Sequence, residues 1–250
     1  MNRAETISSW LKERAAAAGA EGFVFGLSGG IDSAVVARLC QMATPDHVLG
    51  VMLPCYSQAQ DEQDAILVAE AFKIPTVKVD LSKTFDALAS TLDEALKDEH
   101  PKLAVKVVDI KQRLPRANIK PRLRMTSLYY VANALNYVVA GTGNRSEITL
   151  GYYTKYGDGG VDVLPIGALL KSEVRALARE IGVPEPVITK PPTAGLWPGQ
   201  TDEAEMGFTY DMLENYLNGK DVPAKVAERI EQLRTVSDHK RALPPIAPVD

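Results

Sequence analysis

The feature that most constrains the fold is a glycine-rich hexapeptide between a short apolar run and a helical pattern. Residues 22–27 are continuously apolar, as in a strand buried on both faces, and residues 34–39 return to helical spacing. Between them lies Ser-Gly-Gly-Ile-Asp-Ser, residues 28–33, called the SGGIDS loop below. The order strand, loop, helix brings backbone N–H groups and a helix amino terminus to one point, and this predicts an anion site.

The alternation of strands and helices continues along the chain. Strand patterns at residues 47–53 and 76–80 flank a helical pattern at 61–72, and another buried strand is expected at 138–142. Further helices are expected at residues 7–15, ending near Gly19, and at 82–97, 102–114, 171–181, 211–217 and 223–236. Asn118 is predicted to cap a long helix that runs to about Tyr137, with Pro121 in its first turn. The order indicates parallel βαβ units in an α/β fold.

Composition and charge limit the classes of function. With 250 residues, one domain (1–250) with one sizeable core is favoured over two small domains. A net charge of -4 disfavours partners held by bulk electrostatics, such as nucleic acid or a membrane surface. The only cysteines, Cys40 and Cys55, suit neither a disulfide framework nor a zinc site. No apolar run approaches the ~20 residues of a membrane span, and a reducing cytoplasm fits best.

The SGGIDS loop carries a specific chemistry. Gly29 and Gly30 allow backbone to approach a phosphate, and the Ser28 and Ser33 hydroxyls can donate to its oxygens. Asp32 beside phosphates implies a bridging cation such as Mg²⁺. A glycine turn before a capped helix explains a lone Gly-Gly pair equally well. The loop lacks the Lys-Ser/Thr of a Walker motif and the spacing of a dinucleotide fingerprint, which disfavours γ-phosphoryl transfer and hydride transfer.

The whole string is similar to the signature of the N-type ATP pyrophosphatases, which split ATP between its α and β phosphates. Three later segments resemble the NAD+ synthetase branch of that superfamily: Asn-Ile-Lys-Pro-Arg-Leu-Arg-Met at 118–125, Gly-Thr-Gly-Asn-Arg-Ser-Glu at 141–147 and Thr-Lys-Tyr-Gly-Asp-Gly-Gly-Val-Asp at 154–162. The resemblance runs nearly end to end and includes Lys171, the segments at 190–193, 196–197 and 200–203, and the pair His239-Lys240. It implies an open, doubly wound parallel sheet of about five strands flanked by helices, like the adenine nucleotide alpha hydrolases.

The resemblance also implies roles for particular residues. ATP is expected to contact Gly26, Leu27, Ser28, Gly29, Gly30, Ile31, Asp32, Ser33, Thr142, Lys171 and Thr193. Deamido-NAD+ is expected to contact Arg122, Lys155, Asp162, His239 and Lys240, and Mg²⁺ to be held by Asp32 and Glu147. Catalysis is expected to rest on Ser28, Asp32, Ser33 and Lys171. Because the chain has no room for the amidase domain of glutamine-using relatives, the resemblance implies free ammonia as nitrogen donor, unless a separate subunit supplies it. A homodimer is also implied.

Simpler interpretations compete at several positions. Arg122 and Arg124 lie two apart on a helix, so at least one is expected to be solvated, and Arg122 is the favoured ligand. His239 and Lys240 follow a helix end, where cations complement the helix dipole. Asp202 and Glu203 open a helix, where acids are expected for structural reasons, and are left out of the site. Rival functions are a GMP-forming or tRNA-thiolating enzyme of the same superfamily, and a non-catalytic nucleotide-binding module.

Overall fold

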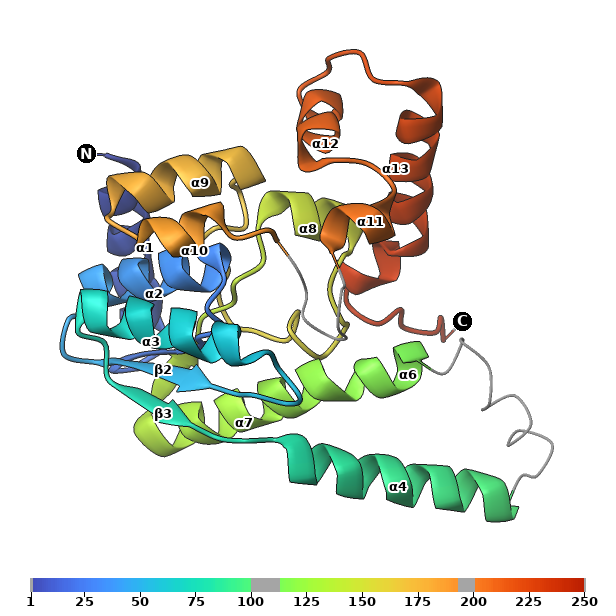
Figure 1. Ribbon diagram of the computed structural model, residues 1–250, viewed down its shortest axis with the longest axis horizontal. Helices are drawn as coiled ribbons and strands as arrows, with labels where there is room; N and C mark the ends of the chain where they lie inside the picture. The colour runs from blue at the N-terminus through green and yellow to red at the C-terminus, as the bar shows by residue number, and fades with distance from the viewer. Residues whose placement is uncertain (1, 100–112, 193–200, 250) are drawn as a thin grey trace.

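A computed structural model describes residues 2–99, 113–192 and 201–249. Most of the helix expected at 102–114, and Thr193, lie outside the described residues. Figure 1 shows a central sheet with helices on both of its faces and a helical unit that projects to one side. The α/β class and the doubly wound arrangement predicted from the sequence are confirmed.

The sheet is parallel throughout. Its order is β3-β2-β1-β4, and its strands are β1 Gly22–Gly26, β2 Val48–Met52, β3 Thr76–Lys78 and β4 Tyr137–Val139. Within the described residues there are four strands, where about five were expected. In place of a fifth strand, the segment beside β4 forms a single β-bridge between Ala140 and Val163. The pairing stops there because the chain leaves the sheet after residue 140 to enter the next helix.

The alternation of side chains along β1 builds a separate core on each face. Phe23 and Phe25 point into the larger core, whereas Val24 joins the smaller one. The larger core is covered by α1 Arg3–Ala17, α2 Ile31–Ala43, α3 Ala59–Phe72, α9 Lys171–Glu180 and α10 Glu185–Thr189. The other face is covered by α4 Ser82–Glu99 and α7 Ile119–Leu135. The helix bounds predicted for these segments agree with the structure to within a few residues, except that α10 was not predicted.

One predicted cap is wrong in its detail. Asn118 stands at the start of α7, but its backbone is helical (φ -69°, ψ -12°) and its side chain forms no cap bond in the described part of the chain. The reason is that α6 Arg113–Ala117 runs almost directly into α7, so there is no extended residue at which a side chain could fold back. Instead, Asn118 Oδ1 accepts a hydrogen bond of 2.8 Å from Thr154 Oγ1.

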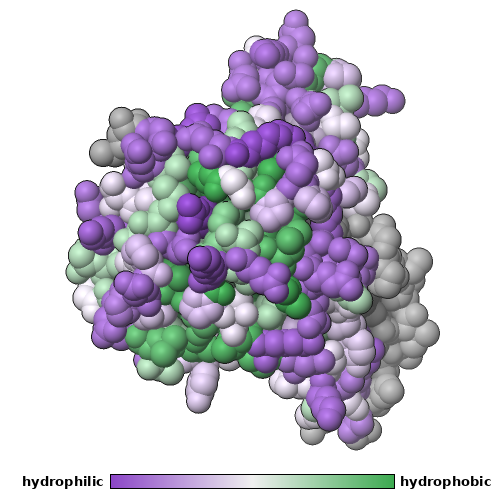
Figure 2. Space-filling view, turned by 60° about the vertical axis from the view of Figure 1, so that its left-hand side comes forward, coloured by the Kyte–Doolittle hydropathy of each residue, from purple (hydrophilic) through white to green (hydrophobic). Residues whose placement is uncertain are grey.

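The projecting unit has a core of its own. It consists of α8 Arg145–Leu150, α11 Asp202–Met206, α12 Tyr210–Leu217, α13 Ala224–Val236 and the 3-10 turn η3 Asp238–Lys240. Leu150, Phe208, Leu213 and Ile230 pack together inside it. Figure 2 shows hydrophilic residues gathered over the top of this unit, with hydrophobic residues visible between hydrophilic ones on the body below. Among the described helices none is long and apolar enough to cross a membrane.

Candidate active site

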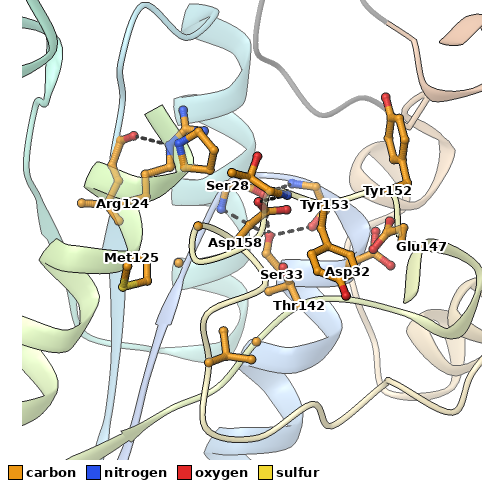
Figure 3. A pocket seen from close by; sticks show the side chains of 18 of the residues that line it. Ser28, Asp32, Ser33, Arg124, Met125, Thr142, Glu147, Tyr152, Tyr153 and Asp158 are labelled. Carbon is orange, nitrogen blue, oxygen red and sulfur yellow. Dashed lines mark hydrogen bonds between the residues drawn. The ribbon is translucent and has the colours of Figure 1, made fainter. Parts of the chain in front are cut away.

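A cleft of about 710 Å³ opens beyond the carboxyl ends of the strands. Ligands of open α/β sheets bind at this edge. The predicted residues that line the cleft are Gly26, Leu27, Ser28, Gly30, Ile31, Asp32, Ser33, Arg122, Thr142, Glu147, Lys155, Lys171, His239 and Lys240. Figure 3 shows Asp32 and Glu147 on one side of this cleft and Arg124 on the other. Of the predicted residues that the structure describes, Gly29 and Asp162 do not line it.

The SGGIDS loop is held in shape by its own serines. Ser33 Oγ lies 3.0 Å from Ser28 Oγ and donates a 2.8 Å hydrogen bond to the Gly30 carbonyl. Gly30 occupies the N-cap position of α2 without a side chain to bond the first N–H groups of the helix. Those N–H groups therefore stay available to an anion at the positive end of the helix dipole.

Gly29 allows α3 to pack closely against the side of the SGGIDS loop that faces away from the cleft. Its φ of +76° lies in the left-handed region that favours glycine. A Cβ placed there would lie 2.3 Å from the Asp61 carbonyl oxygen and 2.9 Å from Asp64 Cβ, both on α3. The glycine therefore lets α3 pack directly against the back of the loop, which explains why Gly29 does not face the cleft.

Lys171 joins two carboxylates at the deep end of the cleft. Its Nζ lies 2.5 Å from Asp32 Oδ2 and 3.6 Å from Glu147 Oε1, and its side chain is only 2% exposed. Burial disfavours the charged ammonium, but Asp32 and Glu147 outweigh that effect and raise the pKa of Lys171. Burial, followed by repulsion from Asp32, raises the pKa of Glu147 to about 8. We call these three residues the Lys171 cluster.

Asn144 orients both carboxylates of this cluster. Its Nδ2 donates 3.0 Å to Asp32 Oδ1, and its Oδ1 accepts 3.0 Å from the Glu147 backbone N–H. Glu147 Oε2 in turn accepts from the Asn144 backbone N–H, which completes a capping box at the start of α8. The helix start therefore sets the position of Glu147.

The donor set suits a hard cation only in part. Carboxylate oxygens are preferred ligands of Mg²⁺, and the Lys171 ammonium shows that the space between Asp32 and Glu147 accepts positive charge. No group of three or more His, Cys, Asp or Glu side chains able to hold a metal is found in the described residues. Mg²⁺ at nucleotide sites is commonly bound by one or two carboxylates together with substrate phosphates. The residues therefore fit Mg²⁺ bound together with a nucleotide.

The basic residues predicted for the second substrate meet around the glycine-rich loop, residues 151–160. Arg122 donates 3.3 Å to the Lys155 carbonyl, and Lys155 Nζ donates 2.6 Å to the His239 carbonyl. Lys240 Nζ donates 2.6 Å to each of the carbonyls of Gly151 and Tyr153. The structure thus brings these residues together, and it gives Lys240 a role in holding the loop.

Asp162 lies apart from this group. Its Oδ2 accepts 2.9 Å from the Val139 backbone N–H, and its Oδ1 accepts 2.8 Å from the Tyr129 hydroxyl. Both oxygens are therefore used to join the end of the glycine-rich loop to β4 and α7.

Arg124 and Asp202 line the cleft although the sequence did not place them among its ligands. Arg124 is directed inward: its Nε donates 3.1 Å to the Leu53 carbonyl, and burial lowers the pKa of its guanidinium. Arg122 is exposed, as expected for at least one of the two arginines, and both line the cleft. The acidic end of the cleft also includes Asp202, which was left out of the site.

Asp202 is 4% exposed, and its Oδ2 accepts 2.9 Å from the Tyr210 hydroxyl. Its Oδ1 is buried without a hydrogen-bond partner in the described parts of the chain. An acid that opens a helix gives no local signal of such a role, because the same residue is expected there on structural grounds.

Comparisons with known proteins agree with this geometry. The chain is 48% identical to an NH(3)-dependent NAD(+) synthetase of Carboxydothermus hydrogenoformans, over 98% of this chain and 96% of the relative. Among solved structures it resembles the NMN synthetase of Francisella tularensis (TM-score 0.89, 37% identity, covering 99% of this chain and 98% of that one). It also resembles the NAD+ synthetase of Burkholderia pseudomallei (TM-score 0.75, 35% identity, covering 97% and 90%). Because residues 3–244 match the NAD synthase family, the chain belongs to that family.

Proposed function

We propose that this chain is an ammonia-dependent NAD+ synthetase, a ligase that uses ATP to amidate deamido-NAD+. The observation that carries the proposal is the composition of one cleft. The SGGIDS loop and the Lys171 cluster lie at one end, and the basic residues Arg122 and Lys155 lie beside the glycine-rich loop. A triphosphate and a dinucleotide carboxylate both need such positive groups.

The proposed reaction couples ATP cleavage to the formation of an amide from a carboxylate and ammonia, in two steps. A nicotinate carboxylate oxygen bonds to the α-phosphorus of ATP, and the bond from that phosphorus to the bridging oxygen breaks, so pyrophosphate leaves. Ammonia then forms the C–N bond and loses a proton, and AMP leaves with the former carboxylate oxygen. The uncapped N–H groups at the start of α2 and the hydroxyls of Ser28 and Ser33 are placed to bind the departing pyrophosphate. Lys171 is placed to neutralise phosphate charge.

Magnesium is part of the proposal. Asp32 and Glu147 would hold it, together with oxygens of the nucleotide. When bound, the ion supplies charge neutralisation for the polyphosphate. Asn144 keeps both carboxylates directed to the same point, so the protein does not have to reorganise them when substrate arrives.

A second candidate function is supported by one comparison. The solved structure with a TM-score of 0.89 is called an NMN synthetase, whereas the Burkholderia NAD+ synthetase gives 0.75. The acid substrate of such a reaction is nicotinic acid mononucleotide, which lacks the adenylate half of deamido-NAD+. The curated relatives at 41–48% identity carry the name NH(3)-dependent NAD(+) synthetase, so the dinucleotide remains the first candidate.

One assay tests both candidates. The protein is incubated with ATP, Mg²⁺ and ammonium, and with either deamido-NAD+ or nicotinic acid mononucleotide, and AMP, pyrophosphate and the amide product are measured together. The dinucleotide is expected to give the higher kcat/KM. A higher value for the mononucleotide would select the second candidate, and absence of amide from both substrates would contradict the proposed function.

We further propose a homodimer in a reducing cytoplasm. Exposed leucines follow one another at helical spacing along α4, namely Leu88, Leu92 and Leu96, and Tyr130 on α7 is 77% exposed. An apolar row of this kind suits a second copy of the chain.

Cys40 and Cys55 are buried free thiols, which suits a reducing compartment.

A further inference from the structure

A second lysine of the cleft is also held between two carboxylates. Lys190 Nζ lies 2.8 Å from Asp61 Oδ1 and 2.6 Å from Asp64 Oδ2. We call these three residues the Lys190 cluster. Lys190 follows α10 directly, and both carboxylates belong to the first turns of α3. The pair of ion contacts therefore connects two helices that are more than 110 residues apart in the sequence.

The two carboxylates have further partners on their own helix. Gln60 Nε2 donates 2.8 Å to Asp64 Oδ1, and the Gln58 backbone N–H donates 3.3 Å to Asp61 Oδ2. Burial disfavours the Lys190 ammonium, but its bonds to Asp61 and Asp64 outweigh that effect and raise its pKa. The Lys190 ammonium is thus already bound by two carboxylates of the protein.

The same turns of α3 support the SGGIDS loop from behind. The nearest atoms to a Cβ placed on Gly29 are the Asp61 carbonyl oxygen, Asp64 Cβ and the Ala65 backbone N. The residues that receive Lys190 are therefore the residues against which the loop rests. A shift of α3 by a few tenths of an ångström would be passed to Gly29, because there is no space between them.

We propose that Lys190 is a positioning residue for the ATP phosphates, acting through α3. By holding Asp61 and Asp64, it fixes the first turns of α3 against Gly29 and so sets the geometry of the loop that cradles the phosphates. The proposal rests on the proposed function for the use of ATP and for the identity of the second substrate. Its predicted effect is on ATP, and nucleotide binding can be measured without any turnover.

The test uses Lys190→Met and a matched control, Lys78→Met. Lys78 also forms an ion pair with α3, at 2.6 Å to Glu62, but the two side chains are 46% and 36% exposed, and neither residue is among the three nearest contacts of a Cβ placed on Gly29. The dissociation constant of ATP is measured by calorimetry, and KM is measured for both substrates. Lys190→Met is expected to weaken ATP binding about tenfold and to leave KM for the dinucleotide within about twofold, whereas Lys78→Met leaves both unchanged.

A double-mutant cycle with Asp64→Asn separates positioning from direct phosphate contact. If Lys190 acts through α3, Asp64→Asn weakens ATP binding as well. The double variant then binds ATP no more weakly than whichever single variant has the higher dissociation constant. If Lys190 touches phosphate directly, removal of the nearby carboxylate strengthens ATP binding, and this result would overturn the proposal. Unchanged ATP binding in folded Lys190→Met would also overturn it. Lys190→Arg keeps the charge and is expected to recover most of the affinity, which covers the case in which Lys190→Met fails to fold.

Discussion

The Lys171 and Lys190 clusters have the same composition, one lysine and two carboxylates, but they differ in how well the charges are compensated. In the Lys190 cluster both ion contacts are hydrogen-bond distances, 2.8 and 2.6 Å, and the side chains of Lys190 and Asp61 retain 21% and 25% exposure. In the Lys171 cluster the lysine is 2% exposed, and its distance to Glu147 is 3.6 Å. Water therefore reaches Lys190 but is largely kept from Lys171, although the carboxylates of Asp32 and Glu147 are 18% and 19% exposed.

The surroundings increase this difference. A third carboxylate, Asp202, lines the same end of the cleft as the Lys171 cluster, and burial raises its pKa. Three carboxylates therefore share one ammonium, and burial together with repulsion, chiefly from Asp32, raises the pKa of Glu147 to about 8. In the Lys190 cluster the lysine forms close ion contacts with both carboxylates, whereas at the Lys171 cluster the carboxylates outnumber the ammonium. A site with more carboxylates than cationic groups is suited to the proposed Mg²⁺, and this contrast can be tested.

The largest expected effect is on catalysis by the Lys171 cluster. Glu147→Gln and Asp32→Asn keep the shape of the side chains but remove the charge proposed to hold Mg²⁺, so each is expected to lower kcat/KM by about 10²- to 10³-fold. Glu185→Gln, in the exposed pair with Arg179 outside the cleft, is the matched control and is expected to have no effect. Steady-state kinetics in saturating Mg²⁺ measures all three. Normal turnover in either cluster variant would remove the distinction drawn between the clusters.

The next effect is on stability in the absence of metal. The pKa of Glu147 is about 8 when folded, against about 4.3 for an unfolded glutamate, so the folded state holds this proton more tightly. The stability it contributes is complete below about pH 4 and is lost as pH rises through about 8, a change on the order of 5 kcal/mol. Chemical denaturation of the metal-free protein between pH 5 and 8.5 measures it.

Glu147→Gln is expected to remove this part of the pH dependence, because glutamine does not titrate. Asp64→Asn in the Lys190 cluster is the comparison, and it is expected to leave the slope in place. The raised pKa values of Asp158 and Asp202 act in the same direction, so the difference between wild type and Glu147→Gln isolates the contribution of Glu147. An identical slope in the two proteins would contradict the assigned pKa shift.

The sequence predicted the fold through local patterns that each element carries by itself. Apolar runs, such as the one at β1, and helical spacing, as in α3, do not depend on distant contacts. The expectation of Asn118 as a cap was wrong because α6 immediately precedes α7, and the fifth strand shrank to a single bridge at Ala140. Both outcomes depend on how neighbouring segments meet, which a local pattern does not record.

The site divides in the same way. Ser28 and Asp32 in the SGGIDS loop, and Glu147 in the segment 141–147, could be named from the sequence because each of these motifs is contiguous. Arg124 and Asp202 could not be named, since their roles follow from contacts with Leu53 and Tyr210, which tertiary packing brings to them. The partnership of Lys190 with α3 is of this second kind, because a lysine before two prolines shows no sign of distant carboxylates.

The smallest effect concerns competition between Lys171 and a divalent cation. The Lys171 ammonium lies 2.5 Å from Asp32 Oδ2, where a metal bound by the same oxygen would meet a like charge. In protein without nucleotide, Lys171→Met is therefore expected to bind Mn²⁺ about tenfold more tightly than wild type, a gain of about 1.4 kcal/mol. Free Mn²⁺ is measured by electron paramagnetic resonance. Lys190→Met, in the compensated cluster, is expected to leave the affinity unchanged.

Equal tightening of Mn²⁺ binding in both variants would mean that any lost positive charge near the cleft has this effect, and the contrast between the clusters would fail. Weaker binding in Lys171→Met would show instead that the lysine helps to hold the carboxylates in place for the metal.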